Sequence, residues 1–275
     1  MDAEPPRIGR VLVIAGSDSG GGAGIQADIK TLTALGAYAA TALTALTIQD
    51  TERVHEIFPV PPAFLARQIA VALDDPGADA IKIGMLGEVA AIEAVADALA
   101  LAGLGLPVVI DPVMLAKGGE ALLAADAMTV FKRRLLPFAT LLTPNIPEAE
   151  ALAGMRIRDR DTMHDAAAAL LTLGVPAVLL KGGHLAGETV TDLLATLDGV
   201  ETFEAPRQPS RHTHGTGCTL ASAIAAGLAA GWTLRAAVAR AHAYVQAAIA
   251  AAPGIGRGHG PLGHMVTIER RWRDG

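Results

Sequence analysis

Val11-Leu-Val-Ile-Ala-Gly16 is a short apolar run, followed directly by Ser17-Asp-Ser-Gly-Gly-Gly-Ala-Gly24, a segment rich in glycine. The apolar run predicts a buried strand that ends in a glycine-rich turn. The sequence then predicts a helix over residues 24–35, where apolar residues recur at helical spacing on one face as Ile25, Ile29, Leu32 and Leu35. A strand, a tight turn and a helix in this order are typical of an α/β protein.

Strand and helix patterns continue to alternate along the chain. Further strands are expected over residues 42–48, 80–83, 108–110, 140–143 and 177–180. Helices are expected over residues 63–73, 89–102, 166–173, 219–230 and 234–251. Residues 189–197 and 200–205, joined through Asp198-Gly199, predict a hairpin. This order predicts an α/β fold with a mostly parallel sheet, helices on both faces and one antiparallel hairpin at an edge.

The composition indicates one globular domain, because 51% of the 275 residues are hydrophobic and no linker interrupts the chain. A net charge of −6 and an aromatic content of 3% provide neither a basic face nor stacking platforms for nucleic acid. The single cysteine fits a reducing compartment, and no segment has the pattern of a signal peptide or a membrane span. We therefore expect a cytoplasmic protein with residues 1–275 as one domain, binding neither nucleic acid nor membrane.

Unusual residues stand where the predicted strands end. They are Gly16, Gln49, Gly84, Asp111, Asn145 and Lys181. Ligands of parallel sheets bind beyond the carboxyl ends of the strands. We therefore expect these residues to gather around one ligand site, and this coincidence is stronger than any single motif.

The clearest chemical signal is His214-Gly-Thr-Gly-Cys218, which precedes an apolar helix. Glycines before a helix allow the backbone N–H groups of Gly215, Thr216 and Gly217 to converge on the charge that builds during phosphoryl transfer. Cys218 would lie at the helix N-terminus, where the thiol pKa tends to fall below its usual value of roughly 8.5. It could then take a proton from an acceptor hydroxyl. The alternative is a small buried cysteine under an ordinary glycine turn.

Lys181 closes an apolar strand and enters a Gly-Gly turn, where a lysine is costly to bury without an anion. A donor phosphate is the expected partner, and the alternative is a lysine that snorkels to the surface. The glycine-rich residues 16–24 are expected to form a substrate wall. Residues 22–27 match the loose dinucleotide pattern G-x-G-x-x-A, but the required acidic residue is missing, and the chain has no P-loop motif.

Oxygen ligands for Mg²⁺ are available at Asp111, which ends a strand, and at Asn145 and Glu148, which begin a helix. On spacing alone, capping of that helix by Asn145 with Glu148 as the capping-box partner is the stronger interpretation. Asp111 is harder to dismiss, because a strand-end acid beside the site gains from a cation. The histidines show no spacing typical of a zinc site.

Other candidates concern recognition of a ring. Gln49 offers a donor and an acceptor, so its amide could bind a ring with an amino group and a ring nitrogen, although a surface polar residue is equally consistent. Met85 and Val113 are expected as apolar pocket walls or as core residues. Asp28 on the first helix could point into the pocket, and a helix-surface acid is the alternative.

Together these motifs resemble those of the bacterial hydroxymethylpyrimidine/phosphomethylpyrimidine kinases, in the ribokinase-like superfamily. The matching segments run in order from about residue 10 to Gly258-His-Gly260 and are Ala15-Gly-Ser-Asp-Ser-Gly-Gly-Gly-Ala-Gly-Ile-Gln-Ala-Asp28, Thr44-Ala-Leu-Thr-Ile-Gln49, Lys82-Ile-Gly-Met-Leu86, Asp111-Pro-Val-Met-Leu-Ala-Lys117, Thr143-Pro-Asn-Ile-Pro-Glu-Ala149, Lys181-Gly-Gly-His184 and Thr213-His-Gly-Thr-Gly-Cys218. The resemblance implies a three-layer ribokinase-like fold, usually a homodimer, and an ATP- and Mg²⁺-dependent kinase. It implies that hydroxymethylpyrimidine and then its monophosphate are phosphorylated.

The resemblance also implies roles for single residues. Cys218 stands where most of the superfamily carries an aspartate base. The pyrimidine would contact Gln49 and Gly16, and the ATP phosphates would contact Lys181 and Thr213, with Asn145 nearby. Mg²⁺ would lie in the region of Asp111, Asn145 and Glu148. Ser19 and Gly20 stand where many members have Pro-Ser, a departure that we do not expect to change the chemistry.

Two other functions fit parts of the pattern. A pyridoxine/pyridoxal kinase of the same superfamily would share the cysteine, but those relatives tend to be apolar where this chain has Gln49. A non-catalytic sensor of the pyrimidine would keep Gln49 and the glycine loop. It would have no need of Cys218, Lys181 and the acidic positions together, so an enzyme is favoured.

Overall fold

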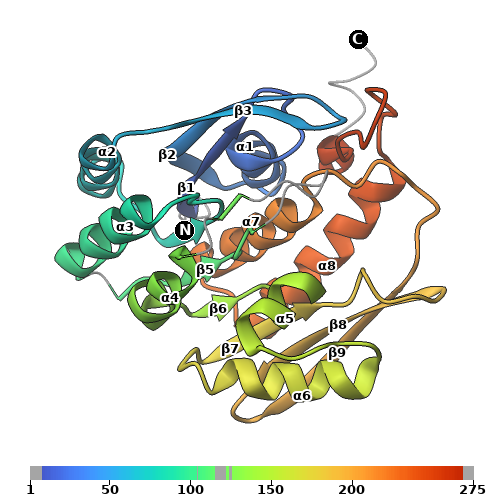
Figure 1. The fold of residues 1–275 in the computed structure, drawn as a ribbon. Helices are drawn as coiled ribbons and strands as arrows, with labels where there is room; N and C mark the ends of the chain where they lie inside the picture. The colour runs from blue at the N-terminus through green and yellow to red at the C-terminus, as the bar shows by residue number, and fades with distance from the viewer. Residues whose placement is uncertain (1–7, 104, 115–121, 124–125, 269–275) are drawn as a thin grey trace, which may run out of the picture.

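The computed structural model describes residues 8–103, 105–114, 122–123 and 126–268 of the chain. Its strands are β1 (Arg10–Asp18), β2 (Tyr38–Gln49), β3 (Val54–Pro59), β4 (Ala80–Ile83), β5 (Val108–Ile110), β6 (Leu141–Leu142), β7 (Ala177–Lys181), β8 (Thr189–Thr196) and β9 (Gly199–Pro206). Within the described residues they form one sheet in the order β3-β2-β1-β4-β5-β6-β7-β8-β9 (Figure 1).

The helices connect these strands. They are α1 (Gly24–Ala34), α2 (Pro62–Asp74), α3 (Val89–Ala102), α4 (Ala127–Val130), α5 (Ile146–Ala153), α6 (Arg160–Leu171), α7 (Thr216–Ala229) and α8 (Leu234–Ala250), with short turns η1 (Phe131–Leu135), η2 (Leu136–Phe138) and η3 (His264–Thr267). No helix among the residues described above is long and apolar enough to cross a membrane.

The centre of the sheet is parallel and both of its edges are antiparallel. Strands β2, β1, β4, β5, β6 and β7 run parallel, whereas β3 and the β8–β9 hairpin run antiparallel to their neighbours. The hairpin was predicted from the sequence, but β3 was not. Five of the six residues of β3 are exposed, so this edge strand carries no alternation of buried and exposed positions that a sequence pattern could reveal.

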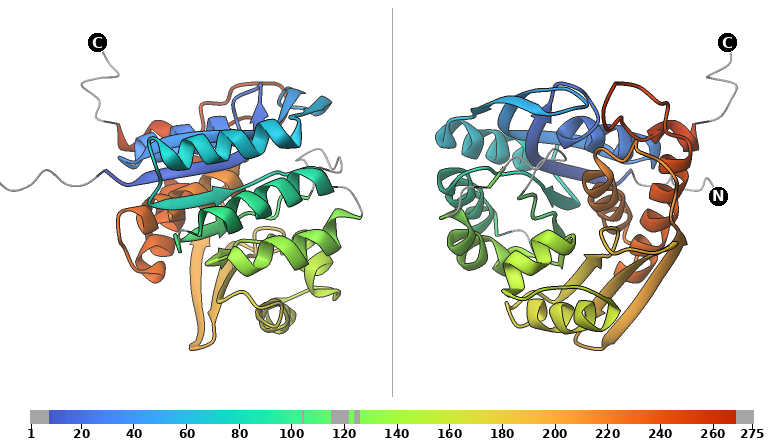
Figure 2. Two further views of the ribbon diagram at one scale, coloured as in Figure 1. Left: turned by 90° about the vertical axis from the view of Figure 1, so that its left-hand side faces the viewer. Right: turned by 45° about the vertical axis from the view of Figure 1, so that its right-hand side comes forward.

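The sheet separates two cores, as expected for a three-layer protein. On one face, Leu12 and Ile14 of β1 pack with residues of α2, α3, α5 and α6. On the other face, Val11, Val13 and Ala15 of the same strand pack with α1, α7 and α8. Alternate side chains of a strand point to opposite faces, and Figure 1 and Figure 2 show the two helix layers on the two sides of the sheet. The predicted α/β class and layer order are confirmed.

The boundaries of β1 and α1 differ from the prediction. β1 extends to Asp18, so Gly16 lies inside the strand, at a bulge between Ala15 and Ser17, rather than in the turn after it. On α1, Ile29 is 38% exposed and does not share the buried face of the helix. Asp28 occupies that face instead. The helix is therefore rotated to bury a carboxylate, which an apolar pattern does not predict.

Two later helices begin earlier than predicted. Helix α6 begins at Arg160 because Asp159 and Thr162 form a capping box before the first apolar residue. Helix α7 begins at Thr216, so its first turn contains Gly217 and Cys218. The glycines that were expected to precede the helix are thus partly inside it.

The chain changes direction across the sheet at β1, which pairs with β2 on one side and with β4 on the other. In open α/β sheets, such a reversal leaves a crevice at the carboxyl ends of the strands, where ligands bind. Gly16 of β1 and Met85, just after β4, meet at this point, since a Cβ on Gly16 would lie 2.7 Å from Met85 Cε. The fold therefore places a candidate site beside β1 and β4.

Candidate active site

The end of β7, the residue after β5 and the first turn of α7 meet at one point. Lys181 Nζ donates to Asp111 Oδ1 at 2.8 Å, and both side chains are largely buried. A Cβ on Gly217 would lie 3.1 Å from Lys181 Nζ and 3.2 Å from Asp111 Oδ2. The predicted convergence is therefore present for Lys181 and Asp111, with the N-terminus of α7 against them.

The anion expected beside Lys181 is supplied in this structure by the Asp111 carboxylate. Burial alone would lower the pKa of Lys181, but Asp111 and then Glu148 outweigh it and raise the pKa. Lys181 therefore keeps its charge, and the alternative of a snorkelling surface lysine is excluded.

The turn before α7 requires glycine for two reasons. Gly215 is the N-cap of the helix at a φ of 80°, a left-handed conformation that side chains disfavour. A Cβ there would lie 1.9 Å from the carbonyl oxygen of Gly22. Thr216 Oγ1 donates to the carbonyl oxygen of Thr213 at 2.7 Å and closes the turn. The two glycine-rich segments of the chain are therefore packed directly against each other.

Cys218 lies in the first turn of α7 and is partly buried. The backbone N–H of Gly24, the first residue of α1, acts to lower the pKa of its thiol. The N-termini of α7 and α1 both lie beside Cys218. Burial nevertheless raises the pKa of the Cys218 thiol to about 11, and the charge of Lys82 opposes the rise. The prediction of a lowered thiol pKa is therefore wrong for the protein without ligand, because loss of solvation exceeds the helix-end effect.

Asp28 is neither a surface acid nor a direct wall of the pocket. Its side chain is 0% exposed, and its carboxylate accepts hydrogen bonds from Lys82 Nζ at 3.0 Å and from Ser222 Oγ at 2.7 Å. The prediction that it binds substrate is not supported by this position, because no ligand can reach a sealed side chain. Asp28 belongs to a buried polar cluster between α1, β4 and α7.

Asn145 and Glu148 form the capping box of α5. Glu148 N–H donates to Asn145 Oδ1 at 3.0 Å, and Asn145 N–H donates to Glu148 Oε2 at 2.8 Å. Burial raises the pKa of Glu148 to about 7, Lys181 opposes the rise and Asp111 adds to it. The capping interpretation is confirmed, and Glu148 nevertheless lies within the electrostatic reach of Lys181 and Asp111.

The donor set at this corner suits a cation that keeps much of its water. The described residues contain no group of three or more His, Cys, Asp or Glu side chains positioned to hold a metal ion. Asp111 Oδ2 faces Gly217 and the α7 turn, while the Asn145 and Glu148 oxygens are engaged in the capping box. Mg²⁺ commonly binds through one or two carboxylates together with water and phosphate oxygens, so Asp111 fits as its protein contact.

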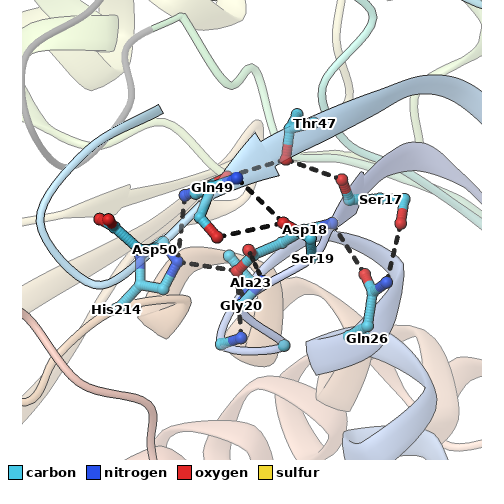
Figure 3. Close-up of polar contacts among 12 residues, drawn as sticks. Ser17, Asp18, Ser19, Gly20, Ala23, Gln26, Thr47, Gln49, Asp50 and His214 are labelled. Atoms are coloured by element: carbon cyan, nitrogen blue, oxygen red, sulfur yellow. Dashed lines mark hydrogen bonds and ion pairs between the residues drawn. The ribbon is translucent and has the colours of Figure 1, made fainter. Parts of the chain in front are cut away.

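The site also contains a histidine–aspartate contact that the sequence analysis did not identify. Asp18 Oδ2 lies 2.9 Å from His214 Nε2, and the carboxylate also accepts backbone N–H groups of Gly20, Gly22 and Ala23 (Figure 3). Burial alone would raise the pKa of Asp18, but His214 and these N–H groups outweigh it and lower the pKa. The pair links the end of β1 to the turn before α7.

Gln49, at the end of β2, points toward the same histidine (Figure 3). Its amide nitrogen lies 3.3 Å from His214 Nε2. An imidazole nitrogen that donates its proton to Asp18 has no lone pair left for the amide. The Gln49 amide oxygen accepts a hydrogen bond from Thr47 Oγ1 at 3.3 Å. Recognition of a ring by Gln49 stays a prediction.

The remaining candidates lie around the same crevice. Met85 is buried, and its carbonyl oxygen accepts a hydrogen bond from Thr44 Oγ1 at 2.6 Å. Val113 follows β5, is half-buried and donates its N–H to the Asp111 carbonyl oxygen at 2.8 Å. In the motif at residues 111–117, residues 115–117 lie outside the described part of the chain.

A family model described as phosphomethylpyrimidine kinase matches residues 18–263, most of the chain. The chain belongs to the phosphomethylpyrimidine kinase family. The match contains Gln49, Asp111, Lys181 and the α7 turn described above. The resemblance drawn from the sequence motifs is confirmed.

Curated proteins are similar to this family member over most of its length. It is 48% identical over 254 residues to a hydroxymethylpyrimidine/phosphomethylpyrimidine kinase of Streptomyces coelicolor, with 92% of this chain and 93% of the relative covered. It is 51% identical over 261 residues to the thiamine biosynthesis bifunctional protein ThiED of Geobacter sulfurreducens, with 95% of this chain covered. The chain spans about half (53%) of that bifunctional relative's length.

A solved structure shows how closely the fold is shared. An ADP complex of Bacillus subtilis pyridoxal kinase aligns with this phosphomethylpyrimidine kinase family member at a TM-score of 0.88 and 36% identity. The alignment covers 94% of this chain and 98% of that structure. The ribokinase-like fold is therefore confirmed, and the fold alone does not separate pyrimidine kinases from pyridoxal kinases.

The sequence analysis did not identify three functional candidates, which are Lys82, Asp18 and His214 as the partner of Asp18. Lys82 stands inside the apolar strand Ala80–Ile83, and a charged residue in a buried strand is a signal that could have been used. Asp18 and His214 are 196 positions apart, so only the folded chain reveals their contact.

Proposed function

We propose that this chain, as one kinase domain over residues 1–275, transfers the γ-phosphoryl group of ATP to hydroxymethylpyrimidine and then to its monophosphate, for thiamine biosynthesis. The observation that carries the proposal is the meeting of Lys181, Asp111 and the first turn of α7, beside Cys218. A buried cation, a carboxylate and convergent backbone N–H groups are the components that phosphoryl transfer requires.

The phosphate side of the site consists of the α7 turn and Lys181. The N–H groups of Gly215, Thr216 and Gly217 and the Lys181 ammonium group stabilise the transferring phosphoryl group, and Thr213 and Asn145 lie beside them. ATP use is supported by the similar fold of the pyridoxal kinase that was solved with ADP.

Mg²⁺ neutralises charge on the phosphates when it is bound. Asp111 would hold the ion, and Asn145 and Glu148 would lie beside it with their own oxygens serving the capping box.

Cys218 serves the acceptor side. The acceptor hydroxyl loses its proton to the Cys218 thiolate, and the oxygen lone pair forms the new bond to the γ-phosphorus. The bond between that phosphorus and the bridging oxygen then breaks with its electron pair, leaving ADP. A base with a raised pKa matches an alcohol better but is less often deprotonated, so the surroundings of Cys218 decide how much thiolate is available.

The pyrimidine ring occupies the crevice at the carboxyl ends of β1 and β4. Gln49 provides hydrogen bonds to the ring, Gly16 allows its close approach, and Met85 and Val113 provide apolar contact. Asp28 is removed from this set because its side chain is sealed in the core.

The test is a product assay with the pure protein, hydroxymethylpyrimidine and Mg·ATP, resolving mono- and diphosphate over time. We expect the monophosphate first and the diphosphate after it. Complete absence of Mg·ATP-dependent product would refute the kinase and favour a non-catalytic pyrimidine sensor.

A pyridoxal kinase is the second candidate, because the structure solved with ADP is a pyridoxal kinase. The polar side chains of Gln49 and His214 favour a ring that can form several hydrogen bonds, as the pyrimidine can. The two candidates separate in parallel rate measurements with pyridoxal and hydroxymethylpyrimidine, where a large preference for pyridoxal would overturn the assignment.

A homodimer in the cytoplasm is part of the proposal. Large apolar side chains are exposed on the β2–β3 edge and on the nearby α2, among them Ile48 (59%), Phe58 (61%) and Phe64 (61%). Several large apolar side chains exposed in one region favour a subunit contact. Sedimentation of the wild-type chain and of a Phe58→Lys/Phe64→Lys variant measures the state, and a wild-type monomer at micromolar concentration would contradict the dimer.

A further inference from the structure

A lysine–aspartate pair without solvent access lies against the helix that carries Cys218. The Lys82 and Asp28 side chains are both 0% exposed and lie 3.0 Å apart. Ser222 Oγ donates to the other Asp28 oxygen at 2.7 Å. Ser222 is four residues after Cys218 on α7, so both side chains project from the same face of the helix. The cluster of Lys82, Asp28 and Ser222 therefore lies one helical turn from Cys218.

Stability is a weak reason for such a pair. Two buried charges lose their solvation, and an apolar pair of similar volume is often equally stable or more stable. Burial alone would lower the pKa of Lys82, but Asp28, Cys218 and Asp111 outweigh it and raise the pKa. Lys82 therefore remains a cation in the interior, and a sealed cation that no ligand can reach can act on a reaction only through its field.

Four charged groups from different elements act on the Cys218 sulfur. Lys82 of β4 and Lys181 of β7 favour the thiolate, whereas Asp28 of α1 and Asp111 after β5 disfavour it. Lys181 is already paired with Asp111 at 2.8 Å and faces the phosphate side of the site. Lys82 is the strongest of these influences in favour of the thiolate. No other described group combines a full positive charge with this sealed position.

We propose that Lys82 is a positioning residue for the kinase reaction, in which its ammonium group, held in place by Asp28 and Ser222, stabilises the thiolate of Cys218 from beneath α7. The inference rests on the proposed function of Cys218 as the proton acceptor. The thiol first releases its proton to solvent, and the resulting thiolate later takes the proton of the acceptor hydroxyl. Lys82 touches neither the substrate nor the reacting atoms.

The single cysteine of the chain makes the test specific. Iodoacetamide alkylation of the full-length protein without substrates, measured over a pH series, reports the thiolate of Cys218 alone. We expect Lys82→Met to slow alkylation, roughly threefold for each unit by which the thiol pKa rises, since greater nucleophilicity partly offsets the loss of thiolate. We expect Asp28→Asn to accelerate it, because the thiolate then replaces Asp28 as the counter-ion of Lys82.

The opposite signs separate the proposal from a purely structural role. If the pair only supports the fold, either substitution loosens the packing around α7, exposes the sulfur and accelerates alkylation. Lys132→Met is the matched control, because Lys132 lies on η1 in the other helix layer and donates to the carbonyl oxygen of Leu152. It should leave the alkylation profile unchanged. Equal or faster alkylation of Lys82→Met than of wild type would overturn the proposal.

A double variant covers the case in which Lys82→Met does not fold. Asp28→Leu/Lys82→Met removes both charges without leaving either unpaired. It should slow alkylation relative to wild type, because Lys82 outweighs Asp28 at the sulfur, and an unchanged profile in the folded double variant would also overturn the proposal. Alkylation needs no pyrimidine or ATP. If the product assay fails while Lys82→Met slows alkylation and Asp28→Asn accelerates it, only the proposed function is rejected.

Discussion

Among the residues that the structure describes, two buried lysine–aspartate pairs have nearly equal length and differ in their access to ligand. In the open pair, Lys181 and Asp111 lie 2.8 Å apart, with side-chain exposures of 13% and 3%. In the sealed pair, Lys82 and Asp28 lie 3.0 Å apart and both are 0% exposed. The open pair lies at the carboxyl end of the sheet against the first turn of α7, and the sealed pair lies deeper, where Ser222 joins it.

This difference in access determines what each pair can do. In the open pair, a phosphate group and a cation can take over from the two partners, because each charge is left with a new counter-ion. In the sealed pair, neither partner can be exchanged without leaving an unpaired charge in the core. The open pair can therefore bind ligand, and the sealed pair can only shape the field around Cys218.

Breaking the sealed pair should have the largest effect, on stability. We expect Lys82→Met to lower the free energy of unfolding by about 3–5 kcal/mol, because Asp28 is left buried and unpaired. Urea denaturation followed by circular dichroism measures the change. The exposed pair of Arg235 and Glu201 is the control, and Arg235→Met should cost at most about 1 kcal/mol. Similar losses in the two variants would remove the distinction drawn between sealed and exposed pairs.

Breaking the open pair should act mainly on catalysis. We expect Lys181→Ala to lower turnover roughly 10²–10³-fold, because one preorganised charge at the transferring phosphoryl group is lost. Steady-state kinetics with Mg·ATP measure it, and Lys132→Ala, which removes a lysine in the other helix layer, should leave turnover within about twofold of wild type. A variant of Lys181 that keeps normal turnover would show that this pair is structural.

Cys218 lies on the helix that both pairs contact, and its substitution tests the proposed proton transfer. We expect Cys218→Ala to lower turnover by roughly 10²-fold or more, the usual contribution of acid–base help, while the affinity for hydroxymethylpyrimidine is retained. Calorimetric titration of the variant checks the affinity. Near-normal turnover would remove Cys218 as the base and leave positioning by the α7 turn as the main catalytic factor.

The smallest expected effect is a pH dependence of stability from Glu148, beside the open pair. Its folded-state pKa of about 7 exceeds the ordinary value because of burial, so the folded protein prefers the protonated form. Its stabilising contribution is present at pH below about 4.3, the pKa in the unfolded chain, and is lost as the pH rises through about 7. In metal-free buffer, Glu148→Gln should remove this slope, at most about 1.4 kcal/mol per pH unit. An identical slope in the variant would contradict the assignment to Glu148.

Much of the architecture follows from the sequence because parallel strands are continuous apolar runs and their ends are marked by unusual residues. The strands of residues 80–83 and 108–110 and the helix of residues 89–102 have the predicted bounds. Lys181, Asp111 and the α7 turn meet because parallel strands end at one edge of the sheet. The family resemblance rested on the same motifs, and the family match confirms it.

Other features depended on contacts between segments distant in the chain. Asp28 could be a surface acid or a pocket residue from its sequence, and only packing against Lys82 and Ser222, 54 and 194 positions away, buries it as an ion-pair partner. Likewise, a helix N-terminus argues for an acidic Cys218 thiol, whereas desolvation in the folded protein raises its pKa. Periodicity and turn chemistry are local, so the sequence alone determined the layers and the order of the motifs. Burial and charge neighbours are global, so the tertiary structure alone decided which charges are sealed and which remain open to ligand.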